Sequence, residues 1–195
     1  MVKNKKIVIG DYINPGEIQD FDLSSTLKLR AKSIDQQKLW ESKDCSAEFM
    51  GDLWSLFVDM EKEKRIRTVL YSVCVELIEN SVKYGCNNSD YMITVDLCLK
   101  RDELLVYVMN KSDLSQISAL EASARLVLNC DNIKALFKQK MREAKAAKKQ
   151  GKNKSQLGYI RIIMQDVKLA WHIEMESVLS VITTLARISL STKDD

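Results

Sequence analysis

Proline, histidine and glycine are scarce in this sequence. One proline, one histidine and six glycines occur among its 195 residues. So few prolines and glycines argue against long disordered tails. The single histidine and the scattered cysteines give no basis for a Cys–His catalytic pair or for a transition-metal site. His172 lies on the outward side of a predicted strand and is interpreted as an ordinary surface residue.

Long apolar runs are also missing. No run approaches the roughly 20 residues that a membrane-spanning helix needs. The first residues, MVKNKKIVIGDYI, are basic, but their apolar stretch is too short for a signal peptide. An odd number of cysteines without Cys-x-x-Cys spacing favours buried, reduced thiols over a disulfide framework; they are Cys45, Cys74, Cys86, Cys98 and Cys130. We therefore expect a soluble cytoplasmic protein without a membrane partner.

The composition is that of an ordinary globular domain, with 46% apolar and 29% charged residues. The chain length suits a single domain over 1–195. Alternating and helical patterns predict, in order, strands within 1–35, helices over 46–61 and 64–84, a hairpin over 92–109, one or two helices over 115–149, a short helix over 156–165 and a hairpin over 168–190. This order predicts an α+β fold with helices on one face of a sheet.

The helix predicted over 64–84 carries polar residues where apolar ones are expected. Its apolar stripe includes Ile66, Val69, Leu70, Val73 and Leu77. At about 100° per residue, the stripe also contains Asn80, while Glu76 and Lys83 lie along one edge. Polar groups on an inward flank are costly unless they are paired or face a polar cavity. The pattern therefore indicates either a ligand site or a buried hydrogen-bond cluster.

The segment Glu76-Leu-Ile-Glu-Asn-Ser-Val-Lys-Tyr-Gly85 resembles the N-box of the GHKL superfamily, the ATP-binding fold of gyrase, histidine kinases and MutL. The resemblance implies a two-layer α/β sandwich with a mixed, mostly antiparallel sheet. It also implies that Asn80 ligates a Mg²⁺ bridging the phosphates of ATP. Glu76 would orient or deprotonate the attacking group, and Lys83 would lie near phosphate. The residue types suit these roles, because an amide oxygen can bind Mg²⁺ and a carboxylate can act as a general base.

Two glycine-rich boxes of the superfamily are reduced in this chain. Asn110 stands where an Asp-x-Gly-x-Gly box has its aspartate, and both glycines are replaced. An Asn amide can pair with adenine through its oxygen and its NH₂ group. Gly158 alone remains of the second box, and Ser155 before it is suited to cap a helix whose backbone N–H groups face phosphate. By the same resemblance, 115–155 corresponds to a helical lid or insert.

Three segments are similar to a narrower group, the SiaB-like free-standing GHKL regulators of bacterial partner-switching systems. They are 27–30 with 45–54, 76–84, and 157–166 with 169–174. This similarity implies an ATP- and Mg²⁺-dependent kinase for a Ser or Thr of an anti-sigma-antagonist (STAS-like) partner. The reduced glycine boxes leave open a non-catalytic domain that regulates by binding proteins. A homodimer is also compatible with the sequence.

Positive charge is concentrated in one segment. Between Lys134 and Lys154 there are nine basic residues and one acidic residue, a local charge of +8 in a chain whose net charge is +3. The rest of the chain therefore carries −5. A solvated helix face explains such a segment, and so does a site for an acidic partner or a polyanion. Nucleic acid is the least favoured ligand, because the segment lacks the interleaved aromatic residues that stack on bases.

Overall fold

The computed structural model describes residues 5–18, 21–31, 36–86, 91–149 and 157–191. Within them, six strands form one sheet: β1 (Lys5–Ile9), β2 (Leu23–Ala31), β3 (Tyr91–Lys100), β4 (Glu103–Asp113), β5 (Lys168–Met175) and β6 (Leu179–Ser189). The order across the sheet is β1-β5-β6-β4-β3-β2. The predicted α+β class is confirmed. The prediction of a mixed sheet is wrong for the described strands, since all their pairings are antiparallel.

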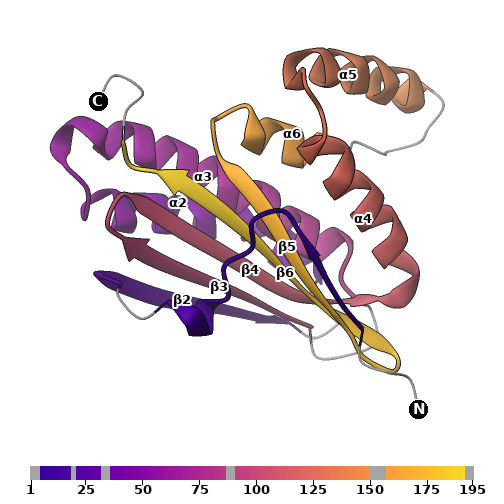
Figure 1. Cartoon of the computed structure of the whole chain (residues 1–195), viewed down its shortest axis with the longest axis horizontal. Helices are drawn as coiled ribbons and strands as arrows, with labels where there is room; N and C mark the ends of the chain where they lie inside the picture. The colour runs from indigo at the N-terminus through magenta and orange to yellow at the C-terminus, as the bar shows by residue number, and fades with distance from the viewer. Residues whose placement is uncertain (1–4, 19–20, 32–35, 87–90, 150–156, 192–195) are drawn as a thin grey trace.

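The helices cover one face of this sheet (Figure 1). They are α1 (Gln36–Glu41), α2 (Lys43–Ser55), α3 (Met60–Lys83), α4 (Leu114–Leu128), α5 (Ile133–Lys149) and α6 (Gly158–Ile163). The α3 helix lies across the sheet and contacts β3, β4 and β6, while α4 and α6 cover the β5 side. None of the helices in the described ranges has both the length and the apolar character needed to span a membrane.

The α3 helix forms because its apolar residues recur every three or four positions and meet the sheet along one stripe. Ile66, Leu70 and Val73 on this stripe are fully buried. The helix begins at Met60, four residues before the predicted start, and ends at Lys83. After it, β3 and β4 form the predicted hairpin, and the apolar β4 lies in the interior of the sheet between β3 and β6.

The helix predicted over 46–61 is shorter and begins earlier, as α2 over Lys43–Ser55. Its inward side is formed by the buried residues Ala47, Met50, Gly51 and Trp54. The Trp54 indole N–H donates a hydrogen bond of 3.1 Å to the Ser25 hydroxyl on β2. The helix therefore packs between α3 and the β2 edge of the sheet.

The two N-terminal strands lie at opposite edges of the sheet. The chain leaves β1 and crosses the face opposite the helices before it enters β2 (Figure 1). Ile18 and the half-buried Tyr12 and Ile13 pack there against a small cluster that includes Tyr107. The Tyr107 hydroxyl donates a 3.0 Å hydrogen bond to the Ile13 carbonyl. His172 stacks on Tyr12 on this face, with ring centroids 5.1 Å apart.

No disulfide joins the five cysteines. Cys74 and Cys86 are buried, whereas Cys45 is exposed and the other two are half-buried. The prediction of buried thiols therefore holds for two positions only. Burial raises the pKa of Cys74 to about 12, which keeps this thiol neutral and unreactive near neutral pH.

Gly10 is where the chain turns from β1 onto the opposite face. Its φ is +75°, and a Cβ atom there would lie 2.8 Å from the Leu169 carbonyl oxygen. We expect Gly10→Ala to lower the free energy of unfolding by about 1–3 kcal/mol, through backbone strain and this contact. Denaturant unfolding measures the change. Gly16→Ala is the control, since a Cβ there meets only Asn14 Oδ1 at 3.6 Å. Equal effects of the two substitutions would contradict the strain argument.

Candidate functional site

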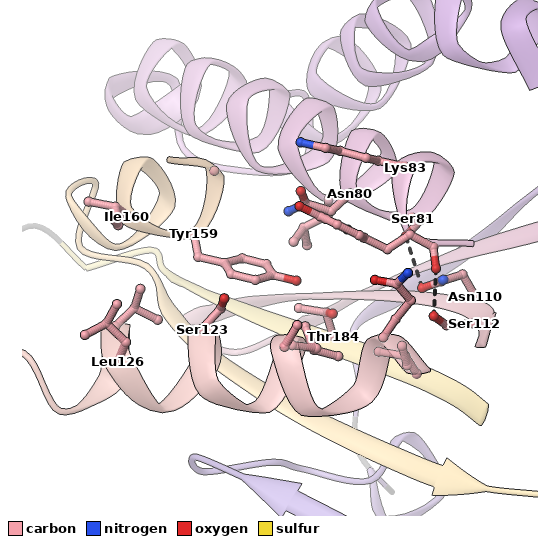
Figure 2. A pocket seen from close by; sticks show the side chains of 18 of the residues that line it. Asn80, Ser81, Lys83, Asn110, Ser112, Ser123, Leu126, Tyr159, Ile160 and Thr184 are labelled. Carbon is pink, nitrogen blue, oxygen red and sulfur yellow. Dashed lines mark hydrogen bonds between the residues drawn. The ribbon is translucent and has the colours of Figure 1, made fainter. Parts of the chain in front are cut away.

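A cavity of about 430 Å³ lies between α3, α4 and α6, with strands β4 and β6 at its base (Figure 2). Neutral polar side chains form part of its lining: Ser81, Asn110, Ser112, Gln116, Ser123 and Thr184. Apolar side chains form much of its wall: Leu77, Ala119, Leu120, Leu126, Val127, Ile160 and Ile182. Two cations, Lys83 and Lys140, also line it. This combination of apolar walls with a few converging polar groups is typical of small-molecule sites.

The cavity brings together most of the residues that the sequence singled out. Asn80, Lys83, Asn110 and Gly158 all line it, although the first and last are 78 positions apart in the sequence. Glu76 does not line it. Ser155 lies outside the described residues.

The α6 helix is held against α3 through successive turns of the longer helix. The Gln165 side-chain NH₂, just beyond α6, donates a 2.9 Å hydrogen bond to the Ser72 hydroxyl. One turn further along α3, Arg161 forms a 2.8 Å ion pair with Glu76. The Glu76 side chain is 13% exposed and that of Arg161 is 51% exposed. The carboxylate proposed from the sequence as a general base is therefore engaged by a cation.

Gly158 meets α3 at the next turn. A Cβ atom on Gly158 would lie 2.7 Å from Glu76 Oε2 and 3.3 Å from Asn80 Nδ2. Only a residue without a side chain allows this approach without displacing the carboxylate. The glycine that the sequence associated with phosphate thus has a packing role against the two residues of the N-box-like pair.

Asn110 lies at the polar part of the cavity, on β4. Its side-chain oxygen accepts a 3.3 Å hydrogen bond from the Ser81 hydroxyl, and its NH₂ group donates to the Lys111 carbonyl at 3.2 Å. Asn110 is 6% exposed and Ser81 is 5% exposed. The side-chain oxygen and the NH₂ group of Asn110 can each form one more hydrogen bond, because an amide oxygen accepts two bonds and an NH₂ group donates two. Asn110 is thus both paired and able to bind a ligand.

Tyr159 is the main cavity residue that the sequence reasoning missed. Figure 2 shows its ring reaching from α6 into the space between α3 and α4, with the hydroxyl directed toward Thr184. Its ring meets Trp171 edge-on, with centroids 5.1 Å apart. Burial raises the pKa of Tyr159 to about 12, so the phenol stays a neutral hydrogen-bond donor and acceptor. Its position directly after Gly158, a residue that the sequence assigns to the site, could have identified it.

The basic segment forms α5, which contacts α6 beside the cavity. Lys140 turns to the cavity and pairs with Glu143 at 2.8 Å. The exposed side of the helix carries a row of cations every three or four residues: Lys134, Lys138, Arg142, Lys145 and Lys149. Lys148 also belongs to α5, whereas Lys152 and Lys154 of the predicted basic segment lie outside the described residues.

The ion pair between Glu76 and Arg161 should couple α6 to α3 measurably. In a double-mutant cycle of Glu76→Ala and Arg161→Ala, we expect a coupling of about 0.5–1 kcal/mol in the free energy of unfolding, since one partner is half exposed. Glu76→Ala with Arg125→Ala serves as the control cycle, because Arg125 pairs with Glu121 on α4 instead. A Glu76–Arg161 coupling no larger than this control would show that the pair does not form in solution.

Comparison of the chain with models of known protein families, and with curated proteins, returned no match.

Proposed function

We propose that this protein is a signalling regulator that binds ATP with Mg²⁺ in the cavity between α3, α4 and α6. The observation that carries the proposal is the convergence of Asn80, Lys83, Asn110 and Gly158 on one cavity. Each of these residues lies in a segment that resembles a GHKL motif. They come from α3, β4 and the start of α6, so proximity in the sequence does not explain their meeting.

The residues present fit such a ligand in size and in chemistry. The cavity volume of about 430 Å³ falls within the range of roughly 300–1,000 Å³ found for small-molecule sites. No group of three or more His, Cys, Asp or Glu residues in the described ranges could hold a metal ion. Mg²⁺ in nucleotide sites needs no such group, because it keeps water and phosphate ligands and takes one or two from the protein. Asn80 would supply that protein ligand.

The chain's own groups divide the binding work between them. The Asn110 amide and the Thr184 hydroxyl offer neutral hydrogen bonds to a heterocyclic base, and the apolar side chains of α4 and β6 offer a surface for its ring. Lys83 and Lys140 offer positive charge to phosphate. Lys83 Nζ now lies 5.3 Å from the centre of the Tyr84 ring, a weak contact that it can exchange for a phosphate.

Phosphoryl transfer to a Ser or Thr of a STAS-like protein is the activity that the SiaB-like segments suggest. In this reaction the bond between the γ-phosphorus of ATP and its bridging oxygen breaks, and ADP leaves. The phosphoryl group forms a bond to the partner's hydroxyl oxygen, whose proton passes to a base. Glu76 is the candidate for the base. It would have to leave Arg161 first, because a paired carboxylate outside the cavity cannot reach a substrate hydroxyl.

The same ion pair favours a second candidate, a domain that binds nucleotide and partner without transferring phosphate. Glu76 is engaged by Arg161 and lies against Gly158, so it is absent from the cavity lining. In this version, nucleotide binding would alter how α6 and α5 sit beside the cavity, and the partner would sense that change.

Binding is tested by titrating the protein with ATP in the presence and absence of Mg²⁺. We expect Asn80→Ala to weaken binding of Mg·ATP by about tenfold or more, while its effect on ATP without Mg²⁺ is small, since the amide acts through the metal. Calorimetry measures both affinities. Asn129→Ala, an exposed amide at the end of α4, should change neither. If Mg·ATP produces neither heat nor a rise in melting temperature with the unmodified protein, the nucleotide proposal fails.

Turnover separates the two versions of the proposal. If the protein transfers phosphate, Glu76→Gln should remove ATP turnover and leave Mg·ATP affinity within about twofold, because the carboxylate would act only in the chemical step. Arg161→Ala should then raise turnover by freeing Glu76. ADP release, with and without a STAS-like protein, measures the rate. Binding without any turnover in the unmodified protein would support the non-catalytic version.

A further inference from the structure

The α2 helix and the turn after it carry apolar residues on two sides. The inward side of α2, with Ala47, Met50 and Trp54, is buried against α3 and the sheet. A second group lies away from the core and consists of Phe49 on α2, Leu56 and Phe57 in the turn, and Met60 at the start of α3. These four residues are called here the outer stripe. Leu53, which lies between them in the sequence, is half-buried and packs against the core.

The outer stripe is largely uncovered in the single chain. Phe49 is 60% exposed, Leu56 is 70% exposed and Met60 is 86% exposed. Phe57 is 50% exposed, and its ring meets that of Trp54 edge-on, with centroids 6.2 Å apart. Single exposed apolar residues are common on protein surfaces, but four large ones in one contiguous stretch are unusual for a surface that stays in water.

The outer stripe lies on both sides of the connection between α2 and α3. Phe49 belongs to α2, which ends at Ser55, and Met60 is the first residue of α3. The exposed apolar surface is therefore built from two helices and the turn that joins them.

The charges around the outer stripe permit self-association. Asp52 pairs with Arg67, and Asp59 pairs with Lys62, so these acidic residues beside the stripe are accompanied by cations. Two copies brought face to face would not place unbalanced charge of one sign against itself at these positions. The cationic outer face of α5 is unsuited to that role, because its row of basic residues would repel its own copy.

We propose that the outer stripe is a dimer interface between two copies of this chain. The α2–α3 connections of the two copies would pack together around a two-fold axis, with each copy using the same surface. From the exposed fractions, the four large side chains offer about 400 Å² per copy, near the lower limit for a specific interface once the surrounding rim is added. The dimer should therefore dissociate on dilution.

This interface is separate from the cavity. No residue of the outer stripe lines it. Dimer formation therefore does not depend on the proposed nucleotide binding and can be tested without a ligand.

Sedimentation velocity over about a hundredfold range of protein concentration tests the proposal. We expect a concentration-dependent shift from monomer to dimer, removed by Leu56→Glu and by Phe49→Glu. Val178→Glu is the matched control, since Val178 is 74% exposed in the turn between β5 and β6. It should leave the dimer unchanged. Leu56→Ala keeps the surface neutral and should weaken association by a smaller factor.

The outcomes are distinct. Melting temperatures of dilute Leu56→Glu and Val178→Glu should match that of the unmodified monomer, because both side chains are exposed; this separates lost association from lost folding. If the unmodified protein stays monomeric at the highest concentration, the outer stripe is not a dimer interface. The proposal is also overturned if dimers persist in Leu56→Glu and Phe49→Glu, or if Val178→Glu removes the dimers.

Discussion

The contact between α6 and α3 determines the shape of the candidate site. Three successive turns of α3 contact α6 and the residue Gln165 just beyond it. Gln165 donates a hydrogen bond to Ser72, and Arg161 forms an ion pair with Glu76. Gly158 lies close to Asn80. The close approach at Gly158 is followed directly by Tyr159, which lines the cavity. Residues of α3 and of 158–160 therefore share one space.

This contact gives the polar residues of α3 two competing uses. Asn80 faces the cavity, where a ligand can reach it, whereas Glu76 is held at the α6 boundary by Arg161. A carboxylate in such a pair stabilises the closed arrangement, and the same carboxylate is the candidate base for phosphoryl transfer. Glu76 therefore has a structural role and a proposed chemical role. Whether it stays paired with Arg161 decides between the catalytic and the non-catalytic version of the proposed function.

The elements were largely predictable because their signals are local. The alternation in 168–175 gave the bounds of β5, and the stripe from Ile66 to Leu77 gave the buried face of α3. The stripe also indicated that Asn80 faces inward. The bounds of α2 do not follow from the sequence pattern, because the apolar spacing from Phe49 to Met60 continues past Ser55, where the helix ends.

What the sequence could not supply was the pairing of distant segments. Nothing local reveals that Arg161 reaches Glu76, or that Tyr159 enters the cavity beside Ser123 of α4, because these contacts depend on how α4 and α6 are placed on the sheet. The opposite positions of β1 and β2 were likewise out of reach. Two strands joined by a turn-like segment with proline and glycine are normally neighbours in a sheet. Here β1 pairs with β5 and β2 pairs with β3, so the segment between them crosses the sheet face opposite the helices.

That crossing has a consequence for how the chain acquires its structure during synthesis. β1 pairs with β5, so Ile7 meets Ile173, 166 positions later in the sequence. The β1 strand therefore cannot pair until β5 has been synthesised. Contacts between such distant positions slow folding, because the loop must close before the pairing stabilises it. The β1 strand is short and begins with Lys5 and Lys6. Both features discourage an unpaired strand from pairing with another chain before β5 is available.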